Sequence, residues 1–364
     1  MTAVLSAPAV GWAADVAALR ARLAAHEADD ATGPTATTER LTLRHRLTTL
    51  TGGSPSEQFA LLAAVDGAVE EFPGWPDLRL LQGSLALALH RPDLALAALA
   101  ALDDVRDQPP VQVLAAGVAA FTGEYADARE LYAAAARRDP RWNTWARLAD
   151  LAVSTGRFDE ADRCFDEAED ELSVKELRAF AWVRVQRGDL ARALGDADRA
   201  AARYEEADRV YPGWWHVAAR RAALDAAQGR PEAAVDRYLA VLGTTDRPEF
   251  REGLGTALAA AGRPFEAATC LESALADYTA SAERGEVHYL HHLAGYWMAR
   301  NPAVAVGWAR RDVDVRRDGR ALSTLAACLY RAGRPVEARR TLREAVRLGA
   351  ADPLLQARIA EIGA

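Results

Sequence analysis

Three histidines stand close together in the last quarter of the chain, in the segment Glu286–His292 (EVHYLHH). In a helix, His288 and His292, four residues apart, and His288 and His291, three apart, are neighbours on one face. Two imidazoles at this spacing can bind a Zn or Cu ion, although a closed site needs one or two further ligands. The segment therefore raises the hypothesis of a metal site at His288 and His292, or of a proton-transfer site around His288, His291 and His292.

A simpler interpretation fits the same residues, since histidines on a helix can line a groove or pack with hydrogen-bonded rings. Tyr289 stands where the zinc-protease motif HExxH has its glutamate, so metalloprotease chemistry is not supported. The chain also lacks the GxSxG, P-loop and CxxC motifs. We therefore expect no catalytic residues and no cofactor apart from a possible Zn or Cu ion. The enzyme hypothesis depends on the histidines alone.

The segment Trp142–Ala168 shows which elements must position such residues. Apolar residues recur at helical spacing from Trp145 to Ala152, Gly156 interrupts the pattern, and Ala161 and Phe165 mark the inner face of a second helix. Each predicted helix is only a few turns long, and an isolated helix of that length is marginal in water. The pair therefore needs a neighbour against which to bury its apolar face.

The same pattern recurs along the chain. A turn residue stands at Gly123, Gly156, Gly195, Gly229, Gly262 and Gly333, with His90 in its place in an earlier copy. Five residues after each turn comes a small residue: Ala95, Ala128, Ala161, Ala200, Ala234, Ala267 and Ala338. Four residues further comes a large one: Leu99, Tyr132, Phe165, Tyr204, Tyr238, Leu271 and Leu342. The small residue allows two helices to approach closely, and the large one fills the space beside it.

This pattern resembles that of the tetratricopeptide repeat (TPR) family over about residues 76–350. The resemblance implies an all-α fold, a right-handed α-solenoid of helix-turn-helix repeats whose concave groove is lined by the first helix of each pair. It implies a scaffold or adaptor that binds a protein or peptide partner, without any particular chemistry. The stretch HHLAGYW is also similar to a helix in TPR proteins of bacterial origin.

The same phasing predicts which residues face the groove. They are the second, fifth, ninth and twelfth residues of each first helix. Their mixture of polar and aromatic side chains is the composition expected where a peptide or a partner helix is held. The candidates are Trp182, Asp189, Arg192, His216, Glu249, Glu252, His288, His291, Arg320 and Tyr330.

The chain is expected to divide into four segments. Residues 1–38 would form a loose tail, a helix that caps the exposed end of the solenoid, and a linker at 29–38 (DDATGPTATT). Residues 39–75 are interpreted as a degenerate opening helix pair, 76–349 as the repeat array and 350–364 as a short closing helix.

Two copies within the array depart from the pattern. In the long copy 173–212, the first helix is expected to begin near Val174. Residues 277–286 (DYTASAERGE) are interpreted as an insertion that shifts the next copy, 287–317, whose turn has lost its glycine.

Composition limits the compartment and the partner. The net charge of −8 argues against nucleic acid as a partner. We expect no signal peptide, no membrane span and no membrane partner, because no apolar run is long enough. Cys164, Cys270 and Cys328 fall inside predicted helices and suggest packed thiols, which agrees with a reducing compartment. The prediction is therefore a cytoplasmic protein.

Charge is unevenly distributed along the chain. Eleven arginines stand against five acidic residues between Arg310 and Arg347. Such a run can be a solvated, salt-bridged helical face, or a docking patch for an acidic partner. A regulator that reads a small molecule is a further hypothesis, but no nucleotide-binding or DNA-binding unit accompanies the repeats.

Overall fold

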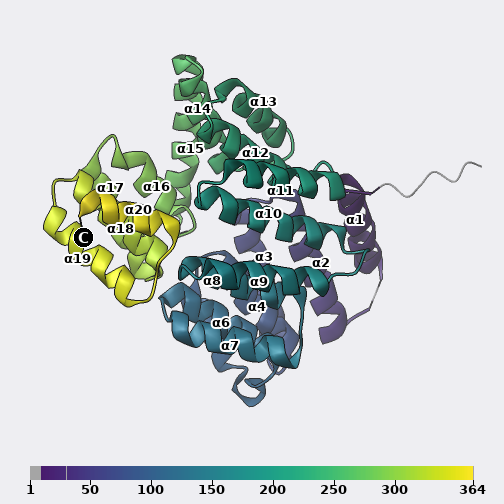
Figure 1. The fold of residues 1–364 in the computed structure, drawn as a ribbon. Helices are drawn as coiled ribbons and strands as arrows, with labels where there is room; N and C mark the ends of the chain where they lie inside the picture. The colour runs from purple at the N-terminus through teal and green to yellow at the C-terminus, as the bar shows by residue number, and fades with distance from the viewer. Residues whose placement is uncertain (1–9, 30, 364) are drawn as a thin grey trace, which may run out of the picture. The chain divides into compact units, whose positions relative to one another are not determined.

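The computed structural model describes residues 10–29 and 31–363, and within these ranges every regular element is a helix (Figure 1). The loose tail expected at residues 1–9 lies outside the described residues. The chain divides into two compact units, each assembled from two separate stretches of sequence. Unit 1 takes the chain up to Glu57 together with Leu172–Ala267, and unit 2 takes Gln58–Glu171 and the chain from Ala268 onward. Among the described helices, none is both long and apolar enough to cross a bilayer.

Unit 1 contains the two N-terminal helices and a run of repeat helices. Their bounds are α1 (Trp12–Ala28), α2 (Pro34–Thr51), α10 (Leu177–Ala193), α11 (Ala197–Val210), α12 (Trp215–Ala227), α13 (Pro231–Leu242) and α14 (Pro248–Ala260).

Unit 2 contains the remaining repeat pairs. Its first stretch holds α3 (Pro55–Glu71, most of which lies in this unit), α4 (Pro76–Ala88), α5 (Pro92–Ala100), the short 3₁₀ helix η1 (Asp103–Val105), α6 (Pro109–Thr122), α7 (Tyr125–Arg138), α8 (Trp142–Ser154) and α9 (Phe158–Asp170). Its second stretch holds α15 (Pro264–Glu283, most of which lies in this unit), α16 (Leu290–Met298), α17 (Pro302–Val315), α18 (Gly319–Arg331), α19 (Pro335–Arg347) and α20 (Pro353–Ile362).

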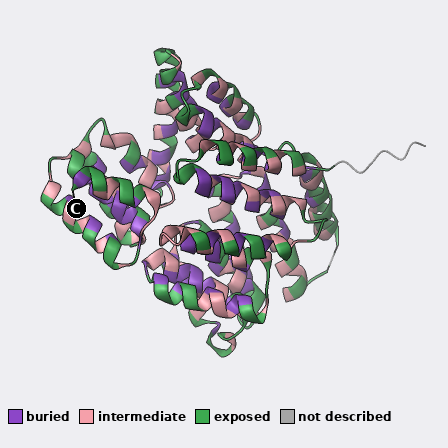
Figure 2. Ribbon diagram, viewed as in Figure 1, coloured by how far each residue is buried: buried purple, intermediate pink, exposed green. Residues whose placement is uncertain are grey.

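Each helix buries one face and exposes the other, as the repeat pattern predicts (Figure 2). The seven small residues of the pattern are all buried, from Ala95 to Ala338. Among the large residues, Tyr132, Phe165, Tyr204 and Leu342 are almost completely inaccessible to solvent. Consecutive helices pack against each other in both units, for example α10 with α11 in unit 1 and α6 with α7 in unit 2. The small and large positions therefore form the contact between the helices of a pair.

The turn positions are also confirmed. All six glycines of the pattern have positive φ, a conformation that costs glycine little. His90 has a φ of 60° and is the single residue other than glycine with positive φ in the described chain. A left-handed conformation costs an ordinary residue roughly 1–2 kcal/mol, so other contacts must hold His90 there.

The N-terminal helices pack against the repeats of unit 1. The indole N–H groups of Trp12 and Trp215 both donate to the carbonyl oxygen of Leu50, at 2.8 and 2.9 Å. The Thr245 hydroxyl donates to the carbonyl of Gly52 at 2.7 Å. The last carbonyls of α2, which have no partner within the helix, are thus satisfied by side chains of other helices and loops. The first helix, which was expected to cap the end of the solenoid, packs against α2 and contacts the residues around Tyr211 and Trp214.

Two boundaries differ from those predicted. The interpretation of 29–38 as a linker was wrong in its second half, because α2 begins at Pro34; proline fits the first turn of a helix, where its missing N–H is not needed. The expected insertion at 277–286 is mostly a continuation of α15, which runs to Glu283. Tyr278, Ser281 and Ala282 are buried there, so the extra residues add packing to the helix.

The irregular copy forms a helix pair despite its missing glycine. Asn301 is the N-cap residue of α17, and its side chain accepts a hydrogen bond from the N–H of Val304. The first helix of the long copy begins at Leu177, three residues after the predicted start near Val174.

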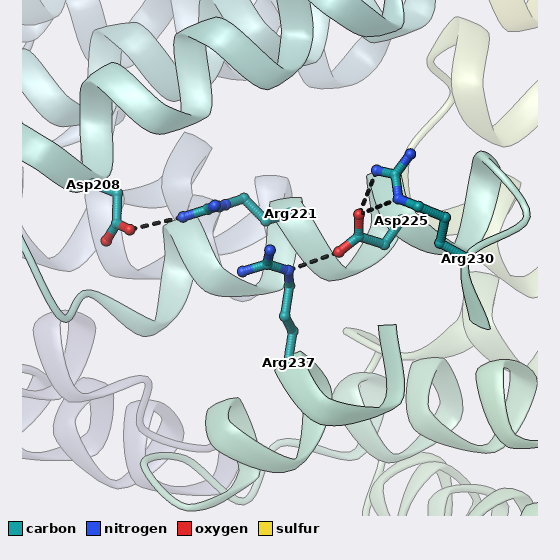
Figure 3. A network of polar contacts seen from close by, with 5 residues as sticks. All are labelled: Asp208, Arg221, Asp225, Arg230 and Arg237. Atoms are coloured by element: carbon teal, nitrogen blue, oxygen red, sulfur yellow. Dashed lines mark hydrogen bonds and ion pairs between the residues drawn. The ribbon is translucent and has the colours of Figure 1, made fainter. Parts of the chain in front are cut away.

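A polar network joins the repeat helices of unit 1 (Figure 3). Asp225 of α12 is 6% exposed and accepts hydrogen bonds from Arg230 (Nε, 3.0 Å) and Arg237 (Nε, 2.7 Å). Burial alone would raise the pKa of Asp225, but the hydrogen bonds and charges of the two arginines outweigh it and lower the pKa. In a neighbouring pair, Arg221 of α12 donates to Asp208 of α11 at 2.8 Å. These contacts connect α11, α12 and α13. Asp225, which pairs with two arginines, is the less exposed of the two carboxylates.

Candidate functional site

A chamber of about 230 Å³ lies within unit 2, between its two stretches of sequence. One wall comes from the α4–α5 turn and from α6, α7 and α8. The other comes from the start of α18 and of α20. Its lining is His90, Ala120, Phe121, Tyr125, Tyr132, Arg147, Asp150, Leu151, Ser154, Arg316, Asp318, Arg320 and Asp352. Repeats far apart in sequence therefore share one concave site.

Backbone contacts hold the two walls together. The N–H of Gly319 donates to the phenol oxygen of Tyr125 at 2.7 Å, and the N–H of Ala351 donates to the carbonyl of Ser154 at 3.0 Å. At Gly156, an added Cβ would meet the carbonyl oxygen of Ala351 at 2.9 Å, so glycine permits the close approach as well as the turn. Burial raises the pKa of Tyr125 to about 12, so this phenol is neutral at physiological pH.

Most acidic groups of the chamber have structural partners. Arg316 donates to both carboxylate oxygens of Asp312, at 2.9 and 3.0 Å, and lies 3.8 Å from Asp318. Asp318 also accepts a hydrogen bond from the N–H of Ala321, which caps α18. Asp352 caps α20 in the same way. These carboxylates are therefore committed to the fold.

Three charged groups of α8 and α18 remain open toward solvent. Arg147, Asp150 and Arg320 line the chamber and are exposed, and none of them belongs to an ion pair described within the resolved ranges. Burial raises the pKa of Tyr132, and the nearby charge of Arg147 opposes that rise. Two guanidinium groups and one carboxylate are thus available to a partner.

Histidines pack at one edge of the chamber. The His90 ring lies 4.6 Å from the ring of His288, 5.9 Å from that of His291 and 5.5 Å from that of Phe121, between centroids. These contacts hold His90 in its left-handed conformation. Burial is the largest cause that lowers the pKa of His90 and of His291 well below the usual value, and the charge of Arg316 acts in the same direction. Both rings are therefore neutral at pH 7.

The helical arrangement predicted for the histidines was wrong in one respect. His288 lies in the turn before α16, which begins at Leu290, so it does not share a helix face with His292. Buried Tyr289 and Leu290 fix this turn by packing beside Tyr278. His292 stacks on Tyr278, with its Nδ1 3.3 Å from the phenol oxygen. Among the described residues, no three His, Cys, Asp or Glu side chains converge as metal ligands, so the metal hypothesis gains no third ligand.

The candidates in unit 1 have mainly structural contacts. Asp189 accepts hydrogen bonds from the Tyr204 hydroxyl (2.7 Å) and from Arg220 (2.9 Å). Burial lowers the pKa of His216 to about 3, and its ring packs against Trp214 and Trp215. Trp182 packs at the edge of the hydrophobic core, and the charge of Arg192 acts on the Tyr204 phenol by lowering its pKa against the larger effect of burial. Glu249 pairs with Arg247, and the backbone carbonyl of Glu252 accepts a hydrogen bond from the Thr256 hydroxyl.

Of the candidates in unit 2, Arg320 lines the chamber directly and His288 and His291 contact its edge through His90. Tyr330, near the other end of α18, is not part of the lining. Sequence reasoning missed Arg147 and Asp150. Asp150 is the ninth residue of α8, so the rule for groove positions would have found it in that copy, whereas Arg147 is the sixth and lies outside the rule.

Comparison with known proteins supports the repeat assignment. A family model described as "Tetratricopeptide repeat" matches residues 143–170, the pair α8–α9. No curated protein sequence matches the chain. In the solved APC/C hetero-tetramer Cut9–Hcn1, one chain is similar with a TM-score of 0.54 at 11% identity. The match covers 94% of the present chain, which spans only 59% of that neighbour.

A second structural neighbour is human IFIT1, solved as a dimer with m7Gppp-AAAA. It matches with a TM-score of 0.51 at 13% identity over 93% of this chain and 95% of its own. At such identities, structural likeness establishes the fold alone. Residues 143–170 thus match a tetratricopeptide repeat, and the buried repeat positions and these neighbours show an all-α solenoid fold for the chain.

Proposed function

We propose that this protein is a non-catalytic scaffold that binds a protein or peptide partner, with the chamber of unit 2 as a principal contact. The observation that carries the proposal is the chamber itself, in which Arg147 and Arg320 from distant repeats face one concave space without a carboxylate partner in the described chain. TPR-type pairs build such concave surfaces by stacking.

The size of the chamber favours a side chain over a small-molecule ligand. Its volume of about 230 Å³ lies below the roughly 300–1,000 Å³ of ordinary ligand pockets. The space suits one or two side chains of a longer segment that continues along the surface. Phe121 and Tyr132 offer aromatic contact area, and the open arginines favour an acidic group on the partner.

We also propose a protein partner rather than nucleic acid, and a reducing compartment such as the cytoplasm. The net charge of −8 disfavours general contact with a phosphate backbone. The m7Gppp-AAAA of the IFIT1 structure belongs to that protein. The free thiols of Cys164 and Cys328 are buried, and burial raises the pKa of each to about 11, so both are poorly reactive and their reduced state fits such a compartment.

The proposal can be tested by quantitative affinity purification from the native host. The double variant Arg147→Ala/Arg320→Ala removes both open guanidinium groups, and each exposed charge contact contributes up to about 1 kcal/mol. We therefore expect recovery of the partner to fall by roughly tenfold, while the far-UV helical signal is unchanged.

Arg137→Ala serves as a control, because Arg137 is an exposed residue in the last turn of α7 outside the chamber. A partner recovered equally with the double variant and with wild type would contradict the chamber assignment.

A further inference from the structure

A second concave surface lies between α19, the second helix of the last complete pair, and the C-terminal helix α20. Its volume is about 770 Å³, much larger than that of the chamber. The floor is apolar, formed by Leu342, Val346 and Ile359. Val346 is 47% exposed, so part of the apolar floor is open to solvent. We call this surface the α19–α20 groove.

Three arginines form the rim of the α19–α20 groove. Arg340, Arg343 and Arg347 stand at positions i, i+3 and i+7 of α19, so they lie on one face and span about 10 Å of the helix. Val336, at i−4 from Arg340, continues the same face and is 71% exposed. The groove therefore combines an apolar floor with a straight row of positive charge.

These arginines differ from several others in the arginine-rich segment. Other arginines of that segment form ion pairs with glutamates: Arg310, Arg317, Arg331 and Arg334. By contrast, Arg340, Arg343 and Arg347 form no ion pair with any residue that the structure describes. Arg340 acts on Glu337 only through a coulombic effect that contributes to its lowered pKa, after the larger effect of Arg334. The guanidinium groups of these three arginines are therefore available to pair with acidic groups of another molecule.

We propose that the α19–α20 groove binds an acidic amphipathic helix of a protein partner. A helix with Leu-like residues on one face can bury them against Leu342, Val346 and Ile359. Acidic residues spaced by three and four along its edge would then meet the three arginines. A nucleic-acid backbone would satisfy the arginines but would leave the apolar floor uncovered. The uneven charge of the segment is thus divided between a salt-bridged face and a docking face.

The test uses a synthetic probe and fluorescence anisotropy on the full chain. The probe is a fluorescein-labelled amphipathic peptide of about 15 residues, long enough for a few helical turns, with Leu on one face and Glu along its edge. The triple variant Arg340→Gln/Arg343→Gln/Arg347→Gln is expected to bind it roughly tenfold more weakly. Binding to wild type should weaken as salt is raised. Val346→Ser tests the apolar floor and should weaken binding with the rim charges intact.

The matched control removes the same number of charges from paired positions, as Arg310→Gln/Arg331→Gln/Arg334→Gln. It should bind the probe within about twofold of wild type, because these arginines lie outside the groove. Equal weakening by the two triple variants would overturn the proposal, since attraction would then be diffuse. Undiminished binding of a peptide with Gln in place of Glu would also overturn it. A third contradicting result would be an RNA oligonucleotide that binds wild type more tightly than the peptide does and whose binding is lost in the triple groove variant.

Discussion

At the scale of single residues, His90 shows how a departure from the repeat rule marks a site. Glycine fills this turn position in six other copies, yet here a histidine is held at positive φ. Its ring contacts His288 and His291, which belong to a repeat far away in sequence. The strain is thus accompanied by contacts that join the two stretches of unit 2. Such outliers often accompany functional surfaces, and this one borders the chamber.

The histidine cluster predicts a pH dependence of stability. The pKa values of His90 and His291 are lowered in the folded chain, so below the unfolded pKa of about 6.5 the unfolded state binds more protons. Stability is therefore full above that pH and is lost as pH falls below it. Between about pH 7.5 and about pH 5, His291→Gln should lose about 1–2 kcal/mol less stability than wild type.

Urea unfolding followed by far-UV circular dichroism at the two pH values measures this difference. His26→Gln is the control, because His26 lies 3.9 Å from Glu39 on the surface of unit 1, outside the cluster. An unchanged pH dependence in His291→Gln would show that the cluster does not oppose protonation.

At the scale of elements, the sequence predicted most of the helices and few of their irregularities. The turn glycines and the small buried residues follow from steric rules that act within one repeat, so the pairs from α4 to α19 could be recognised. The start of α2 at Pro34 follows a local rule, the fit of proline to the first turn of a helix. The extension of α15 and the turn at His288 depend on packing with other helices. The chamber was largely missed because Arg147 and Arg320 line one concave space only when distant repeats come together.

The network around Asp225 gives a prediction for the packing of α12 and α13. Asp225→Asn removes the negative charge that holds Arg230 and Arg237 while keeping the shape of the side chain, and should destabilise the protein by about 1–3 kcal/mol. Asp208→Asn breaks the more exposed pair with Arg221, for which we expect about 0–1 kcal/mol.

Thermal unfolding of the two variants at neutral pH makes the comparison. Because the pKa of Asp225 is lowered by folding, its contribution is present above the unfolded value of 3.8 and is lost as pH falls through the folded value. The difference between Asp225→Asn and wild type should therefore shrink in strong acid. Equal losses in the two variants at neutral pH would refute the central role of Asp225.

At the scale of the whole molecule, the fold explains why recognition, and not catalysis, is the function proposed. Stacked pairs bury their apolar faces against each other and leave concave surfaces with mixed charge. A fold by itself does not specify a partner. The specific information lies in the side chains that the stacking leaves open, which are Arg147, Asp150 and Arg320 in the chamber.

The central claim is that a partner enters the chamber of unit 2, and site-specific photo-crosslinking tests it most directly. A photoreactive phenylalanine analogue at Phe121, which lines the chamber, should form a covalent adduct with the partner in host extract. The same analogue at Phe265, an 89% exposed residue of α15, should not. The Phe121 adduct should disappear in the Arg147→Ala/Arg320→Ala background. A partner that co-purifies yet crosslinks only from Phe265, or from neither position, would contradict the account.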